Sequence, residues 1–277
     1  MLRPRIIPCL LVHGAGLVKT VRFASPKYVG DPLNAVRIFN EKEVDELMVL
    51  DIDATARQRE PDYARIRALA AECRMPLCYG GGVKSVEQVE KIVSLGVEKV
   101  AISSAAVDDP ELVARMADVV GSQSVVVVLD VRRSAAGVYE VYTHNGTRNT
   151  RKNPAEFAVH LESLGVGEIV VNSIDQDGAM KGYDTALVAA LRKALTVPLT
   201  ALGGAGTLDD IGALMRDFGN IGAAAGSLFV FKGVYRAVLI NYPSRADKDA
   251  LIARYHTDPS RARNAHARER PALKESR

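Results

Sequence analysis

The chain has 277 residues, of which 48% are hydrophobic and 25% charged, with a net charge of +3. This composition is typical of soluble globular proteins, and no apolar stretch approaches the roughly 20 residues that a membrane-spanning helix needs. The apolar run that follows Arg5 already contains Pro8 and is too short for a secretory signal, so we expect a cytoplasmic protein without a membrane partner.

Cysteine and histidine usage argues against a disulfide framework or a metal centre. The three cysteines include no C-x-x-C pair, and the five histidines form no close cluster. We therefore expect reduced core thiols, no metal and no cofactor. The last stretch, residues 256–277, is basic and poor in apolar residues, so we expect a disordered tail. Because it has no interleaved aromatic residues, nucleic-acid binding is not expected.

Eight short β-rich runs alternate with longer amphipathic stretches along the chain. Continuous apolar strands suit a parallel sheet that is buried on both faces, and eight strand-helix units predict a single (β/α)8 TIM barrel over residues 1–255. A doubly wound open sheet is the alternative. The predicted strands begin near Ile6, Leu47, Leu77, Val100, Val125, Ile169, Leu199 and Ala223.

The barrel is predicted to consist of two similar halves. The first three spacings between strand starts, about 41, 30 and 23 residues, recur as about 44, 30 and 24 in the second half. Motifs recur at the same rhythm, because residues 80–82 (GGG) correspond to residues 203–205 (GGA). In this repeat Asp130, which follows four valines, should be matched by an acid at the end of the first strand. Leu11 stands there instead.

Glycines and small hydroxyl residues at corresponding strand ends predict two phosphate sites. Glycine lets the backbone approach a phosphate, and a helix N-terminus supplies N–H donors. Each glycine alone could equally form a tight turn or a cap, but the repeated arrangement favours a ligand with a phosphate at each end. The first site comprises Gly81, Gly82, Ser103 and Ser104, and the second comprises Asp177, Gly178, Gly203, Gly204, Gly226 and Ser227.

Three acids and one lysine are further candidates. An unpaired carboxylate at Asp130 would be costly unless it faced the barrel mouth, which favours a functional role. Asp51 and Asp177 either act at the site or cap the loops that follow them. Lys19 lies in a glycine-rich stretch that we interpret as a flexible loop over the mouth. It either closes on a phosphate or is an ordinary solvated lysine, and a P-loop is excluded because Val18 replaces the required glycine.

Several motifs together resemble the cyclase subunit of imidazole glycerol phosphate synthase, over about residues 1–255. They are residues 5–10 (RIIPCL), 45–52, 80–82 (GGG), 173–178 (SIDQDG) with 182–184 (GYD), and 203–206 (GGAG). In that family the barrel receives ammonia from a partner glutaminase and uses it to split a bis-phosphorylated intermediate of histidine biosynthesis. The resemblance matches Asp130 to one of two acid-base carboxylates and Lys19 to a mobile-loop lysine.

This chain departs from the family pattern at its reaction centre. Leu11 replaces the second acid-base carboxylate, Ser103 stands where asparagine is usual, and Asn172 stands where threonine is usual. A positioned proton-transfer group typically contributes about 10²- to 10⁴-fold, so the loss should slow a cyclase by about that factor.

The resemblance also implies an ammonia entrance at the opposite end of the barrel. It matches a ring of four charges at strand starts, and it matches Glu98 to an acid that docks the glutaminase. A purely structural ring of ion pairs is the alternative, although buried charges are expensive to keep without full pairing. The ring consists of Arg5, Glu46, Lys99 and Glu168.

Residues 10–12 and 16–23 look more like a paralogue branch that accompanies a glutaminase and an N-acetyl sugar amidotransferase in surface-polysaccharide pathways. There the ammonia helps convert an acetamido group into an acetamidino group. Three hypotheses follow. The first is an ammonia-handling barrel with impaired cyclase activity, and the second is a working cyclase in which Asp53, Asp177 or water replaces the lost acid. The third is a catalytically inactive barrel that only binds and activates the glutaminase.

Overall fold

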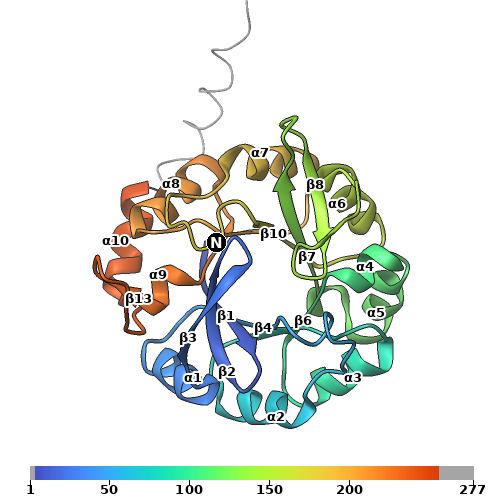
Figure 1. The fold of residues 1–277 in the computed structure, drawn as a ribbon, viewed down its shortest axis with the longest axis horizontal. Helices are drawn as coiled ribbons and strands as arrows, with labels where there is room; N and C mark the ends of the chain where they lie inside the picture. Colours follow the sequence, from blue (N-terminus) through green and yellow to red (C-terminus); the bar gives the residue numbers. More distant parts are fainter. Residues whose placement is uncertain (1–3, 256–277) are drawn as a thin grey trace, which may run out of the picture.

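The computed structural model describes residues 4–255, and these form a closed barrel of eight parallel strands surrounded by helices (Figure 1). Strand β12 pairs with β1, and β10 pairs with β7, which closes the sheet. The predicted (β/α)8 barrel is therefore confirmed, and the open-sheet alternative is excluded. The barrel strands are β1 (Arg5–His13), β4 (Leu47–Asp51), β5 (Leu77–Gly80), β6 (Lys99–Ile102), β7 (Val125–Arg133), β10 (Glu168–Ser173), β11 (Leu199–Leu202) and β12 (Gly222–Ala225).

The helices start at recognisable capping residues and bury one face against the strands. Ser85 accepts a hydrogen bond from the amide of Gln88, and Thr207 forms a capping box with Asp210. The outer helices are α1 (Pro32–Glu41), α2 (Tyr63–Glu72), α3 (Val86–Ser94), α5 (Leu112–Val120), α6 (Pro154–Ser163), α7 (Thr185–Ala194), α8 (Leu208–Phe218) and α10 (Arg245–Tyr255).

The two halves of the barrel repeat their irregular elements as well as their strands. The nine-residue strands β1 and β7 both continue into antiparallel ribbons, β2 (Gly16–Val21) with β3 (Ala24–Gly30), and β8 (Tyr139–Thr143) with β9 (Arg148–Asn149). Short helices α4 (Ser104–Asp108) and α9 (Ser227–Val230) follow β6 and β12. A third ribbon, β13 (Phe231–Lys232) with β14 (Ala237–Val238), follows α9.

The interior of the barrel is a packed apolar layer. Inward-facing residues form a cluster separate from the larger core between strands and helices, as expected for a barrel whose interior is a core and not a pore. Cys9 and Cys78 belong to this layer, Cys73 is partly buried, and all three thiols are free. The interior cluster comprises Ile7, Cys9, Met48, Cys78, Ala101, Val126, Val128, Val170, Leu202 and Ala224.

No helix between residues 4 and 255 combines the length and apolar character that crossing a membrane requires. The predicted basic tail, residues 256–277, lies outside the described residues.

Candidate functional site

One cavity lies at the carboxyl ends of the barrel strands, and it brings together the predicted catalytic and phosphate-site residues. This is the end of a (β/α)8 barrel where the loops after the strands build binding sites. The cavity is lined by Leu11, Lys19, Gly81, Gly82, Ser103, Ser104, Asp130, Asp177, Gly178, Gly203, Gly204, Gly226 and Ser227. Asp130 therefore faces the mouth of the barrel, as expected because an unpaired carboxylate would be costly in the apolar interior.

Asp130 and Leu11 lie on opposite sides of this cavity. Strands β7 and β1 are separated by three strands in either direction around the barrel. Burial raises the pKa of Asp130 to about 7, a hydrogen bond from Asn172 opposes this rise, and the negative charge of Asp177 adds to it. Nδ2 of Asn172 donates to Oδ1 of Asp130 at 2.9 Å. A carboxyl group that titrates near neutral pH can act as a general acid or base.

The other two acids that line the cavity, Asp51 and Asp177, already accept hydrogen bonds. Oδ1 of Asp51 accepts hydrogen bonds from the amides of Asp53 and Ala54 at 2.9 and 3.1 Å. Oδ2 of Asp177 accepts from the hydroxyl of Thr20 at 2.7 Å and from the amide of Phe23 at 3.1 Å. Asp51 therefore caps the loop that follows it, whereas the Asp177 carboxylate binds the β2–β3 ribbon and does not cap its own loop.

Asp53 does not line the cavity, and its carboxylate binds residues of a neighbouring turn. Although burial raises its pKa, hydrogen bonds from the Gly14 amide and the His13 ring hold that pKa below the ordinary value. The Asp53 oxygens lie 2.8 Å from Nδ1 of His13 and from the amide nitrogen of Gly14. Asp53 therefore anchors the turn between β1 and β2.

Lys19 is not on a flexible loop, and it is not solvated. It lies on β2, which pairs with both β1 and β3, and it is 5% exposed. Its Nζ donates to the carbonyl of Cys9, and burial lowers its pKa. A Cβ on Gly226 would lie 2.7 Å from this Nζ, so glycine is needed there to admit the lysine. The loop prediction was wrong because residues 16–21 extend the sheet.

Most glycines of both predicted phosphate sites have backbone conformations that favour glycine, and Gly226, with φ of −101°, is the exception. Gly81 and Gly82 have φ of 117° and 74°, and Gly203 and Gly204 have φ of 93° and 110°. A Cβ on Gly203 would lie 2.8 Å from the carbonyl oxygen of Ser173. These turns therefore require glycine with or without a ligand, and they bring the backbone to the cavity wall at corresponding places in the two halves.

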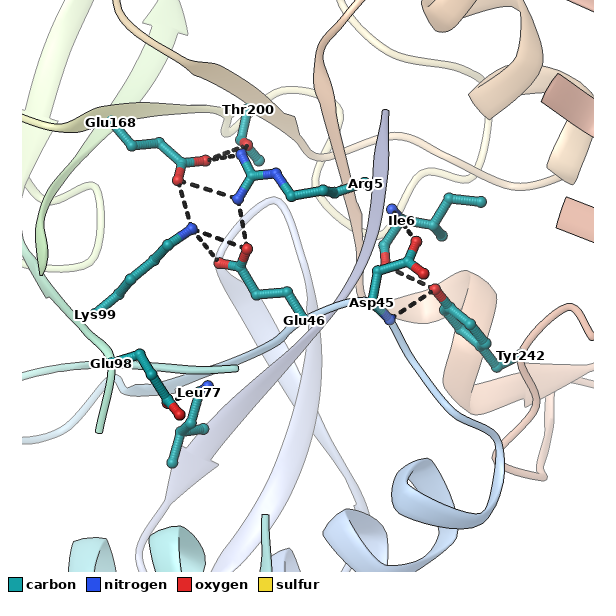
Figure 2. Close-up of polar contacts among 10 residues, drawn as sticks. All are labelled: Arg5, Ile6, Asp45, Glu46, Leu77, Glu98, Lys99, Glu168, Thr200 and Tyr242. Carbon is teal, nitrogen blue, oxygen red and sulfur yellow. Dashed lines mark hydrogen bonds and ion pairs between the residues drawn. The ribbon is translucent and has the colours of Figure 1, made fainter. Parts of the chain in front are cut away.

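The four predicted ring residues form a closed ring of alternating charges at the other end of the barrel (Figure 2). Arg5 binds Glu46, and its Nη2 lies 2.7 Å from Oε1 of Glu168. Nζ of Lys99 lies 2.9 Å from an oxygen of each glutamate. Although burial raises the pKa of Glu168, Arg5 and Lys99 hold it at about 2. The two glutamates are 3 and 4% exposed, and each pairs with both Arg5 and Lys99, as buried charges require.

Thr200 is a fifth member of this cluster, which the sequence reasoning missed. Its hydroxyl donates to Oε1 of Glu168 at 2.6 Å (Figure 2). A Cβ on Gly222 would collide with the Thr200 side chain, so the small residue on β12 makes room for the hydroxyl on β11. The signal in the sequence that could have identified Thr200 was its polar side chain in the otherwise apolar strand Leu199–Leu202.

Glu98, the predicted docking residue, lies beside the ring on an exposed position. Its Oε2 accepts a hydrogen bond from the amide of Leu77 at 2.8 Å (Figure 2). One oxygen therefore supports the start of β5, and the exposed side chain stays available to a partner. Within residues 4–255, no group of three or more His, Cys, Asp or Glu side chains could hold a metal ion.

The fold and the site define a (β/α)8 barrel with a two-sided glycine-lined cavity at one end and a sealed ring of charges at the other. Residues 5–236 match the family described as histidine biosynthesis protein, and the chain belongs to this family.

Several named proteins are similar to this chain over most of its length. A protein of Leptospira interrogans, provisionally named imidazole glycerol phosphate synthase subunit HisF, is 54% identical over 253 residues, which are 91% of this chain and 100% of the relative. Proteins provisionally named subunits hisF3 of Vibrio vulnificus and hisF2 of Pseudomonas aeruginosa are each 56% identical. They cover 91 and 88% of this chain and 97% of their own lengths. The chain is thus a HisF-like member of the family.

Proposed function

We propose that this chain is the ammonia-conducting barrel subunit of a glutamine amidotransferase complex, with a cyclase centre weakened by Leu11. A glutaminase would bind at the charge ring and near Glu98. The ammonia would serve an N-acetyl sugar amidotransferase, which converts an acetamido group of a surface-polysaccharide sugar into an acetamidino group. The observation that carries the proposal is the complete ring of Arg5, Glu46, Lys99 and Glu168 behind a cavity in which Leu11 stands opposite Asp130.

The apolar interior supports passage of neutral ammonia. Burying an ion without a partner is costly, whereas a small neutral molecule costs much less to bury. Side chains such as Ile7, Met48 and Val126 lie between the ring and the cavity, and they offer no charge to ammonium. The ring is closed by direct ion pairs, so ammonia would enter only when these pairs part.

The loss of one acid-base group opposite Asp130 supports a slower cyclase reaction. Asp130 can move one proton near neutral pH, but Leu11 opposite it cannot act as the second proton carrier. Loss of one such group should lower the rate by about 10²- to 10⁴-fold. The glycine turns and Lys19 are retained, and these groups would bind the phosphates of the original intermediate or of another ligand.

A spectrophotometric assay with the bis-phosphorylated intermediate and ammonium salt tests the weakened centre. We expect turnover at least about 100-fold below that of an ordinary cyclase, and partial recovery in Leu11→Asp. Turnover within about tenfold of an ordinary cyclase rejects the proposal. For the ammonia route, purified glutaminase with glutamine should support amidination only when this chain is present, and Lys99→Met should reduce the transfer.

A working cyclase subunit in histidine biosynthesis is the second candidate, because Asp177 lines the same cavity and acts electrostatically on Asp130. Under this alternative Asp177 would supply the missing acid, and Asp177→Asn would abolish a substantial cyclase activity. If the chain stimulates the glutaminase but passes no ammonia to either reaction, it is a non-catalytic activator.

A further inference from the structure

Exposed apolar side chains gather on the ribbons beside the cavity mouth. Among residues 4–255, nine large hydrophobic side chains are exposed, and six of them lie on β2–β3 or on the segment from β13 to residue 239. Single exposed apolar residues are ordinary, but a gathered set marks an interaction site. We call this set the mouth patch, and it consists of Val21, Tyr28, Val234, Tyr235, Val238 and Leu239.

The two ribbons form one surface. Nζ of Lys27 on β3 donates to the carbonyl of Arg236 at 3.2 Å and lies 5.0 Å from the ring centre of Phe231. Arg236 in turn donates to the carbonyl of Gly178 at 3.4 Å. Because Gly178 and Phe23 line the cavity, whatever covers the mouth patch borders the cavity entrance. The tip residues Val234 and Tyr235 are each 96% exposed.

The charged residues of the two ribbons themselves have one sign. Residues 16–30 and 231–239 contain basic but no acidic residues, whereas the whole chain is nearly balanced, with 36 basic and 33 acidic residues. Arg22, Lys27 and Lys232 are exposed, and Arg236 is half-buried. Complementary charge steers a partner and fixes its register, so the fitting surface is apolar with an acidic edge.

The backbone of the ribbon favours a protein over a lipid surface. Among residues 4–255, β3 pairs with β2 and with no other strand, so its outer edge presents main-chain N–H and C=O groups. A protein partner can hydrogen-bond such an edge, whereas an apolar lipid interior cannot. A second copy of this chain is disfavoured because two basic rims would repel each other.

We infer that the mouth patch docks a second enzyme, which covers the cavity and takes up ammonia where it leaves the barrel. Its docking surface is apolar with an acidic edge. The identity of this enzyme rests on the proposed function, which makes it the N-acetyl sugar amidotransferase. A reaction centre in which Leu11 stands opposite Asp130 suits this arrangement, because the group that receives the nitrogen would lie in the partner and not in this cavity.

The test measures binding between the purified full chain and a purified N-acetyl sugar amidotransferase by isothermal titration calorimetry. Val234→Ser with Tyr235→Ser removes the apolar tip, and Lys232→Glu with Arg236→Glu reverses the charge. We expect each pair to weaken binding by about tenfold or more. The matched control, Val119→Ser with Val159→Ser, removes exposed valines on α5 and α6 and should leave the affinity unchanged.

Equal binding of the wild type and both ribbon variants overturns the inference and leaves the proposed function standing. Absence of binding also overturns it, and so does preferential binding to phosphatidylglycerol vesicles over the enzyme. Whichever outcome overturns the inference, glutamine-dependent amidination, measured separately with the purified proteins in one mixture, tests whether the proposed function is correct.

Discussion

Asn172 on β10 donates to Asp130 on β7 at 2.9 Å, across a register in which the two residues are direct partners. The amide therefore stabilises the ionised form of a carboxyl group that burial drives toward the neutral form. The amide oxygen of Asn172 is buried and has no hydrogen-bond partner among the described residues. One side-chain hydrogen bond therefore joins Asn172 to Asp130.

Replacing Asn172 with leucine should raise the pKa of Asp130 above about 7, because the hydrogen bond that opposes burial is lost. The substitution also removes a buried acceptor without a partner, so the cost in stability should be small. Carbon-13 NMR titration of the Asp130 carboxyl measures the shift. Asn34→Leu, on the exposed surface of α1, is the control. An unchanged titration would show that Asn172 does not tune Asp130.

Asp130→Asn should stabilise the protein, and more so as the pH rises. The folded protein holds the Asp130 proton up to about pH 7, whereas the unfolded chain releases it near pH 4. The free energy of unfolding therefore falls as pH rises through this window, whereas that of the Asp130→Asn variant does not fall in this way. Urea denaturation should show a gain of about 1–4 kcal/mol near pH 8 and little gain near pH 4. A constant difference at all pH values would contradict this assignment.

Thr200→Val should weaken the charge ring. The loss of a hydroxyl that binds a buried carboxylate should cost about 1–3 kcal/mol and raise the pKa of Glu168 from about 2. The stability that Glu168 contributes is present above its unfolded pKa of about 4.3 and is lost as pH falls toward about 2. The variant should lose this stability at a higher pH than the wild type, as acid unfolding would show.

Thr196→Val is the matched control for Thr200→Val. Thr196 also donates its hydroxyl to a glutamate, Glu162, at 2.6 Å, but on the exposed surface. Backbone amides of Thr196 and Val197 still bind Glu162 after the change. Its effect should stay below about 1 kcal/mol, and an equal loss in both variants would mean that Thr200 adds nothing to the ring.

The sequence predicted the barrel because its strands are short, apolar and regularly spaced, and the repeat located the corresponding strand ends. It also named the residues that line the cavity and form the ring. It failed at Lys19, where glycines at residues 14 and 16 suggested a loop. Residues 17–21 are rich in valine and threonine, and these β-branched residues indicated a strand. Thr200 was missed because its partner, Glu168, lies on a neighbouring strand, and only the register shows that they meet.

Asp177→Ala should release the β2–β3 ribbon from the cavity mouth. The Asp177 carboxylate holds Thr20 and Phe23, and its main-chain carbonyl accepts from the amide of Arg22 at 3.0 Å. Removal of the carboxylate costs two hydrogen bonds to a charged group, each worth about 1.5–3 kcal/mol before solvent screening. The local opening of the ribbon should therefore become at least about tenfold more frequent.

Trypsin cleavage after the exposed Arg22, followed by mass spectrometry, measures this opening under native conditions, because cleavage reports the population of the open form. Asp175→Ala is the matched control, since Asp175 lies in the same loop but accepts from the amide of Arg133 on β7. It should leave cleavage at Arg22 unchanged. Equal cleavage in wild type and Asp177→Ala would mean that pairing with β1 and the main-chain bond from Arg22 to residue 177 hold the ribbon. The Asp177 carboxylate would then remain available for proton transfer beside Asp130.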